Sequence, residues 1–238
     1  MTFTSKRAIV LGGSSGIGLA SAQALAAAGA EVLISGRDPG RLEDALGTLP
    51  ASARGQALDV LDVDALQALF QAETGFDYLV NAATGGERAV GPFEQMSLAG
   101  FQGSFRKLWG YTNAVHEALP HLAADGAMVL VSGSPARKCP PGYSAISTVG
   151  NAVEGFVRAI AVEIAPRRIN TVAPGFIDTP MFPQTGAERE AFMERTTAAN
   201  LIPRPGRAEE VADAVLFALG NGFVTGTTID VDGGALLP

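Results

Sequence analysis

Short runs of aliphatic and β-branched residues alternate along the chain with longer segments that have the apolar spacing of amphipathic helices. The short runs predict strands at residues 8–11, 31–35, 78–81, 127–132, 168–173 and 227–231, with a weaker one at 54–58. The helical pattern covers residues 16–28, 41–46, 63–73, 98–119, 145–163 and 208–219, and a short one covers 188–199. Because strands and helices alternate without tight hairpins, the pattern predicts a parallel sheet with helices on both faces.

The predicted fold class is therefore α/β, as one doubly wound domain spanning residues 1–238. A chain of this length commonly forms a single α/β domain, and no linker, repeat or low-complexity tract divides it. One region departs from the pattern. Residues 174–205 are punctuated by prolines and glycines around a single short helical segment, which is typical of a lid over a ligand site.

Charge and cysteine content narrow the classes of partner. The formal net charge is −7 and the basic residues are scattered, so we expect no nucleic-acid partner. Cys139 is the single cysteine, which excludes an internal disulfide and fits a reducing compartment. The apolar runs are too short to span a bilayer, and the first residues lack the apolar core of an export signal. We expect a soluble, cytoplasmic protein with no membrane partner and no metal site.

A glycine-rich turn follows the first predicted strand and opens directly into a helix. It reads Gly12-Gly13-Ser14-Ser15-Gly16-Ile17-Gly18. Glycines allow a tight turn and close backbone approach, and the helix N-terminus offers free N–H groups and a positive dipole to a pyrophosphate. The strand–turn–helix context favours a Rossmann-type dinucleotide site over a merely structural turn.

This turn resembles the cofactor loop of the short-chain dehydrogenase/reductase family, and further matches extend along nearly the whole chain. Asp59-Val60 resembles the family's adenine-contacting pair, Asn81-Ala82-Ala83 its Asn-Asn-Ala-Gly segment, and residues 173–181 the segment that closes over the nicotinamide. Residues 206–212, 224–226 and 230–234 resemble its C-terminal third. The resemblance implies the following cofactor-binding residues: Gly12, Ser14, Ser15, Gly16, Ile17, Gly18, Asp59, Val60, Asn81, Pro174, Gly175, Ile177 and Thr179.

The end of the second strand indicates which nucleotide is preferred. An acidic residue there accepts hydrogen bonds from the ribose of NAD, whereas this chain has Ser35-Gly36-Arg37. Arg37 offers a permanently charged, planar fork suited to a 2′-phosphate, so we expect NADP (NADPH) as the cofactor and Arg37 as a binding residue. The alternative is a solvated arginine beside Asp38.

The resemblance also shows what the chain lacks. Family members reduce a carbonyl with a Tyr, a Lys four residues later, a Ser and an Asn. Alignment through residues 152–155 places Ile146 at the Tyr position and Gly150 at the Lys position. Counting back by the family's usual spacing places Gly133 at the Ser position, and counting back from residues 119–121 places Lys107 at the Asn position. None of the three tyrosines has a lysine four residues later, so this absence does not depend on the alignment.

Other residues could replace the lost groups. Lys107 is predicted to project toward the vacated space with Tyr111 one turn along the same helix face, and Ser132, Ser134 and Tyr143 are close in sequence to the substituted positions. The candidate catalytic residues are Lys107, Tyr143 and Ser132, although a structural or interface role for Lys107 stays open. His116 and His121 are interpreted as surface or cap residues.

Two hypotheses follow. The first is an NADP(H)-binding oxidoreductase that acts on an unknown carbonyl or alcohol through a nonstandard site. The second is a catalytically silent pseudoenzyme that uses the nucleotide as a structural or sensory ligand. The resemblance also implies a homotetramer in which residues 98–119 and 145–163 pack against their copies, with Gly150, Ala152 and Gly155 allowing close approach.

Overall fold

A computed structural model describes residues 2–84, 86 and 88–237. Its centre is a seven-stranded sheet in the order β3-β2-β1-β4-β5-β6-β9, and every neighbouring pair is parallel. The predicted doubly wound α/β architecture is confirmed. The sheet strands are β1 Arg7–Leu11, β2 Glu31–Gly36, β3 Arg54–Ala57, β4 Phe76–Asn81, β5 Leu122–Val131, β6 Arg168–Pro174 and β9 Thr228–Val231.

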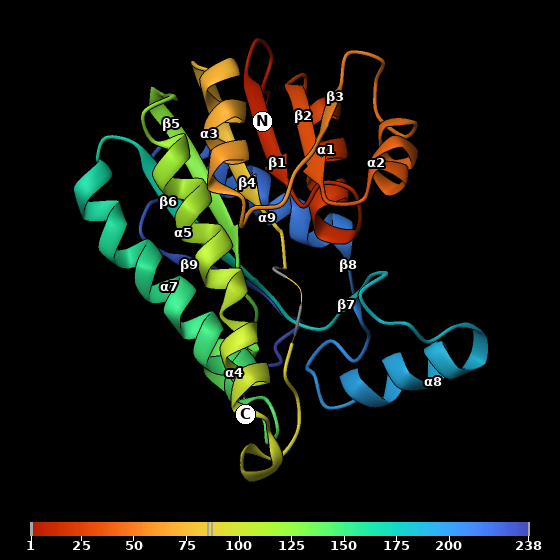
Figure 1. The fold of residues 1–238 in the computed structure, drawn as a ribbon. Coiled ribbons are helices and arrows are strands. Elements are labelled where there is room, and N and C mark those ends of the chain that lie inside the picture. The colour runs from red at the N-terminus through yellow and green to blue at the C-terminus, as the bar shows by residue number, and fades with distance from the viewer. Residues whose placement is uncertain (1, 85, 87, 238) are drawn as a thin grey trace.

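Helices cover both faces of this sheet (Figure 1). One layer comprises α3 (Val63–Ala72), α5 (Arg106–Ala118) and α7 (Ser144–Ile164). The other comprises α1 (Gly16–Ala27), α2 (Pro39–Leu46) and α9 (Ala208–Gly220). The remaining elements are the short helices η1 (Phe93–Gln95), α4 (Leu98–Ser104) and α6 (Pro135–Lys138), the helix α8 (Gly186–Thr197), and the strands β7 (Ile177–Asp178) and β8 (Gly206–Arg207).

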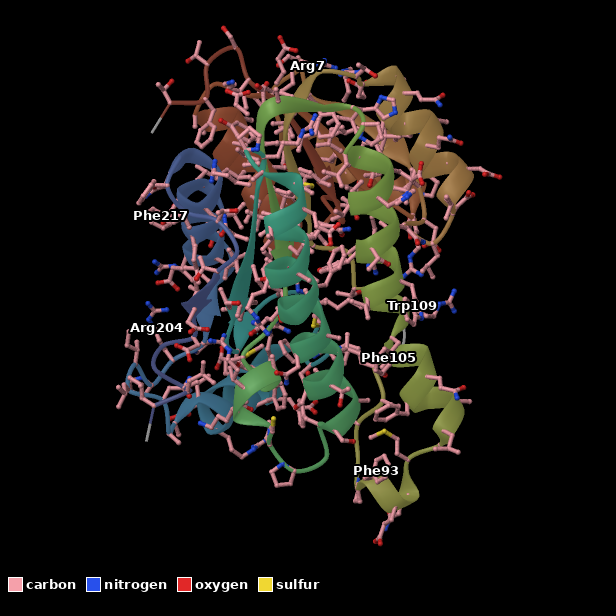
Figure 2. All side chains as sticks on the ribbon, turned by 90° about the vertical axis from the view of Figure 1, so that its left-hand side faces the viewer. Arg7, Phe93, Phe105, Trp109, Arg204 and Phe217 are labelled. Carbon is pink, nitrogen blue, oxygen red and sulfur yellow. The ribbon has the colours of Figure 1, made fainter. Side chains whose placement is uncertain are left out.

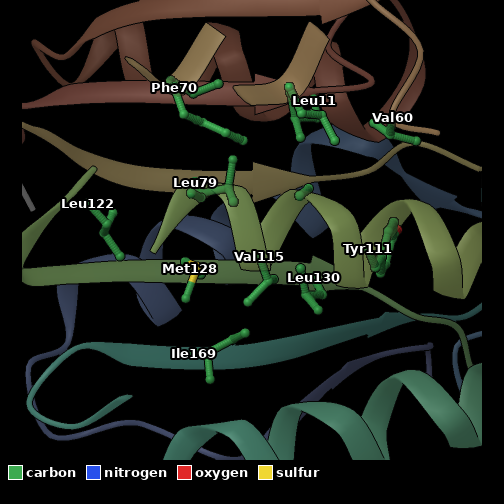
Figure 3. Close-up of a cluster of buried hydrophobic side chains, with 14 of the residues drawn as sticks. Leu11, Val60, Phe70, Leu79, Tyr111, Val115, Leu122, Met128, Leu130 and Ile169 are labelled. Carbon is green, nitrogen blue, oxygen red and sulfur yellow. The ribbon is translucent and has the colours of Figure 1, made fainter. Parts of the chain in front are cut away.

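The alternation of side chains along the strands explains why these segments are continuously apolar. In β1, Ile9 and Leu11 join the core under α3, α5 and α7, while Ala8 and Val10 join the core under the other helix layer. Figure 3 shows the first core, in which Leu79, Met128 and other sheet residues meet side chains from the helices. A strand buried on both faces has no polar positions, so it reads as an unbroken hydrophobic run.

Helix α7 is the longest helix in the described part of the chain. By length and hydropathy alone it could cross a membrane. However, one stripe of its surface, including Val153, Val157 and Ile164, is buried in the core beside α5 and β6. Packing against the sheet therefore accounts for its apolar character.

The segment predicted as one helix at 98–119 is two helices. Helix α4 ends at Ser104, and the amide of Phe105 donates to Gln102 O, a tighter bond than the regular helical one. Gly100 and Gly103 weaken this stretch, because glycine has low helix propensity, and the Ser104 hydroxyl donates to Gly100 O instead of to solvent. Helix α5 then begins at Arg106 in a slightly different direction (Figure 1).

The predicted lid has its own small structure below the carboxyl edge of the sheet (Figure 1). Strand β7 pairs with β8, and α8 follows the turn after β7. Phe176, Phe182 and Phe192 pack with ring centroids 4.4 to 5.7 Å apart. Arg189 forms an ion pair with Asp178 and donates to backbone carbonyls nearby, so the segment is tied together internally.

Candidate nucleotide and catalytic site

The glycines after β1 are required by close backbone contacts. Gly12 has φ +77°, and a Cβ there would lie 2.6 Å from the amide nitrogen of Ala83. A Cβ on Gly18 would lie 2.1 Å from Gly12 O. Helix α1 begins at Gly16, and helix geometry leaves its first N–H groups without intrahelical acceptors. The turn therefore presents uncovered backbone donors at a positive helix end.

Four other predicted cofactor segments converge on this turn. A Cβ on Gly36 would lie 2.5 Å from Ser14 Oγ, and one on Gly16 would lie 3.4 Å from Thr179 Cβ. Leu58 donates to Gly36 O, which brings Asp59 to the same edge. The carboxyl ends of β1, β2, β3, β4 and β6 thus meet where the sequence analysis placed the nucleotide.

Asn81 contributes an unusual polar group to this edge. The residue is fully buried at the end of β4, and its side-chain oxygen accepts from the Ala83 amide at 3.1 Å. Its Nδ2 has no hydrogen-bond partner among the described residues. A buried donor without a partner is costly and is often satisfied by a ligand or water, so the donor set here fits a bound nucleotide.

Arg37 is exposed immediately after β2 and forms no ion pair with any described residue. The side chain of Asp38, which could neutralise it, instead accepts from the Arg41 amide and caps α2. This arrangement leaves the guanidinium of Arg37 available for a phosphate.

The structure explains why the usual ammonium cannot stand at position 150. A Cβ on Gly150 would lie 2.8 Å from the Cβ of Ala136, because α6 packs directly against α7. At Gly133 a Cβ would meet Pro135 at 3.4 Å, an ordinary contact. Helix α6 therefore covers α7 at Gly150, so this position is not open to a second copy of the chain, contrary to its predicted role in subunit contact.

The ammonium of Lys107 lies at the carboxyl end of β5. Its Nζ donates to the carbonyl oxygen of Ser132 at 3.1 Å and sits 5.4 Å from the centre of the Tyr111 ring. Burial, with a smaller contribution from the positive charge of Arg88, lowers the pKa of Lys107 to about 7. An amine with this pKa exchanges protons readily near neutral pH.

The hydroxyl groups near Lys107 differ in whether they are free to bind a substrate. Tyr111 does not share the open site with Lys107, because its ring is buried in the core and its hydroxyl donates to Val131 O at 2.8 Å. The Ser132 hydroxyl donates to Gly150 O at 3.3 Å, so Ser132 meets Lys107 through its backbone carbonyl. Tyr143, at the start of α7, is partly exposed and its hydroxyl makes no hydrogen bond to a described residue. His116 is exposed on the surface.

Arg88 is a site residue that the sequence reasoning missed. It lies in the loop after β4, and its Nη1 contacts the sulfur of Met181 in the lid at 2.6 Å. It interacts electrostatically with both Tyr143 and Lys107, two of the candidate catalytic residues. Nothing in the local sequence marks Arg88, because its relation to Lys107 arises only from tertiary packing.

Comparisons with known proteins identify the family of this chain. A family model described as enoyl-(acyl carrier protein) reductase matches residues 12–235. The chain is 29% identical to the short-chain dehydrogenase/reductase ATR9 of Stachybotrys chlorohalonatus, over 99% of each chain. The chain belongs to the short-chain dehydrogenase/reductase family.

Two solved structures bear on the site. A short-chain oxidoreductase of Pseudomonas aeruginosa PAO1, described as containing an atypical catalytic center, has a TM-score of 0.90 at 29% identity and is covered to 98%, with 99% of this chain. A small-chain dehydrogenase in complex with NADPH has a TM-score of 0.83 at 28% identity, over 98% of this chain and 99% of that one.

Proposed function

We propose that this protein is an NADP(H)-dependent oxidoreductase that interconverts a carbonyl compound and an alcohol, with Lys107 holding the proton that moves to or from the substrate oxygen. The single observation that carries the proposal is the position of the Lys107 ammonium at the carboxyl end of β5, where Nζ donates to the Ser132 carbonyl oxygen and where burial lowers its pKa to about 7. Family membership supplies the reaction class, and the site must supply the chemistry.

The residues present fit the nucleotide. The turn from Gly12 to Gly18 and the start of α1 would hold the pyrophosphate, Asp59 the adenosine, and Arg37 the 2′-phosphate. The structure of a relative in complex with NADPH supports the same choice. When bound, NADPH supplies the hydride for carbonyl reduction.

Lys107 would act where negative charge develops on the substrate oxygen during reduction. Its protonated amine can donate a hydrogen bond and then the proton to that oxygen, while the Ser132 carbonyl keeps Nζ at the end of β5. Tyr143 has a free hydroxyl near Arg88 and would help to orient the substrate oxygen. Ile146 and Gly150 contribute neither a phenol nor an amine.

The test is turnover of NADPH with a panel of ketones and aldehydes across pH 6 to 9. Because the working form of Lys107 is protonated, kcat/KM for reduction should fall as the pH rises through about 7. Lys107→Met should abolish turnover while retaining nucleotide binding in a thermal-shift assay, and Arg106→Gln, an exposed neighbour on α5, should change neither. Turnover that is indifferent to Lys107→Met would overturn the assignment. A nucleotide-induced thermal shift without turnover of any compound would support the silent alternative.

We also propose a homotetramer formed through α4, α5 and α7. Aromatic side chains form a row from η1 along α4 and α5, with Phe93 and Trp109 exposed at its ends and neighbouring ring centroids 5.8 to 6.3 Å apart (Figure 2). On α7, Val162 is 82% exposed. Large apolar side chains gathered on one face mark a protein interaction site, and homo-oligomers are normally closed and symmetric.

A further inference from the structure

Two cations occupy the catalytic end of the site, and each is positioned by a separate element. Lys107 extends from α5 to the Ser132 carbonyl. Arg88 lies in the loop that follows β4, which is held by two hydrogen bonds just after Arg88: the Ala89 amide donates to Ser104 Oγ at 3.0 Å, and the Gly91 amide donates to Gly142 O at 2.9 Å. The second bond ties the Arg88 loop to the residue before Tyr143.

Neither cation has an acidic partner among the described residues. In contrast, six other arginines form ion pairs among the described residues, namely Arg7, Arg54, Arg137, Arg189, Arg204 and Arg207. The contact that Arg88 does make is to the Met181 sulfur, which is a weak acceptor. Most N–H groups of the guanidinium therefore remain available for a stronger acceptor.

The electrostatics at this end are unfavourable without an anion. Arg88 is exposed to solvent, yet the surrounding protein is dense enough to lower the pKa of its guanidinium. Its positive charge also helps to lower the pKa of Lys107. Unpaired cations in a partly desolvated site are costly, and a bound anion would offset the repulsion between them. The chain as a whole is acidic, with a net charge of −7, yet no carboxylate among the described residues forms an ion pair with either cation.

We infer that Arg88 binds a carboxylate on the substrate, so that the substrate class is a small carbonyl compound or alcohol that also carries a carboxylate. This inference rests on the proposed function. The planar guanidinium can donate two parallel hydrogen bonds to a carboxylate, and the Met181 contact places it beside the lid. With its carboxylate on Arg88, the substrate can present its reacting oxygen toward Lys107 and Tyr143.

The test measures binding and does not need turnover. The protein, saturated with NADP so that the phosphate-binding groups are occupied, is titrated by calorimetry with benzoate and with benzamide, which have the same shape but differ in charge. Benzoate should bind more tightly than benzamide. Arg88→Gln should weaken the binding of benzoate by roughly tenfold or more, as expected for loss of a charge-assisted pair, and should leave the affinity for benzamide unchanged. Arg88→Lys should retain part of the preference, and Arg106→Gln should retain all of it.

A second readout follows from the coupling between the two cations. Because a bound anion favours the charged form of Lys107, benzoate binding at pH 8 should take up protons, seen as a binding enthalpy that depends on the ionisation enthalpy of the buffer. Lys107→Met should remove this buffer dependence. Benzoate that binds only without NADP, or that binds Arg88→Gln as tightly as the wild type, would overturn the inference. Benzoate binding without any carbonyl turnover would instead keep the anion site and refute the proposed reaction.

Discussion

The stability of the protein should depend on pH through Lys107, and the sign of the effect follows from its pKa. In the unfolded chain a lysine has a pKa of about 10.4, whereas in the folded protein burial lowers the pKa of Lys107 to about 7. Below pH 7 both states are protonated, and the folded state bears the full cost of a partly desolvated ammonium. Between pH 7 and about 10 only the unfolded chain holds the proton, so stability rises with pH.

The magnitude can be worked from this difference. When the unfolded state binds one more proton than the folded state, the free energy of unfolding rises by about 1.4 kcal/mol per pH unit. Between pH 7.5 and 9 this gives about 2 kcal/mol, and the partial solvent contact of Lys107 reduces the expected gain to roughly 1–2 kcal/mol. Lys107→Met keeps an unbranched chain against the Tyr111 ring but removes the titrating group, so its stability should lack this rise.

The assay is urea unfolding of both proteins at half-unit steps from pH 6.5 to 9.5. At each pH the free energy of unfolding of the variant is subtracted from that of the wild type. Equal m values would show that the comparison reports stability alone. Lys6→Met serves as the control. The hydrogen bond from Lys6 to Asp77 raises the pKa of Lys6, so both states stay protonated over most of this range and its difference curve should be flat. A flat curve for Lys107→Met as well would refute a depressed pKa and, with it, the reason for assigning proton transfer to Lys107.

Three further predictions test the cofactor site, the substituted positions and the assembly. Arg37→Ala should weaken NADPH by roughly tenfold or more and leave NADH unchanged, measured by fluorescence titration; equal loss for both nucleotides would contradict a 2′-phosphate contact. Gly150→Lys should cost about 1–3 kcal/mol in urea unfolding, because its Cβ meets Ala136 at 2.8 Å, whereas Gly133→Ser should cost little. Light scattering should return about four times the 24.4 kDa chain mass, and Trp109→Glu should lower it; a monomer at micromolar concentration would contradict the tetramer.

Sequence reasoning recovered the fold because the sheet is buried on both faces. Strands such as β1 and the second half of β5 read as apolar runs, and the helices between the strands keep their own spacing. The elements that it missed are short. Helix α6 has four residues, and β7 and β8 have two each, so none is long enough to show a period.

The part of the candidate site that the sequence marks locally is the glycine-rich turn after β1. The turn from Gly12 to Gly18 is marked by the glycines that its close contacts require, and those contacts are present in the structure. Arg88 lies in a loop without periodicity, and its importance depends on distant residues in α5 and the lid. The prediction that Tyr111 faces the same space as Lys107 was wrong for a related reason. A shared helix face does not reveal that the Tyr111 hydroxyl donates to Val131 O in the core.

The substitutions at positions 107 and 150 have a common structural explanation. Helix α6 occupies the space that a side chain at 150 would need, and α6 is held there by Asn151, which donates to Ala136 O, and by an ion pair between Arg137 and Asp230 of β9. An ammonium can then reach the end of β5 only from another element. Lys107 approaches from α5 and binds the carbonyl of Ser132, directly before Gly133. Restoring the usual lysine therefore requires moving α6. Removing Lys107 leaves Lys138 of α6, whose Nζ instead donates to the carbonyl oxygen of Ala235.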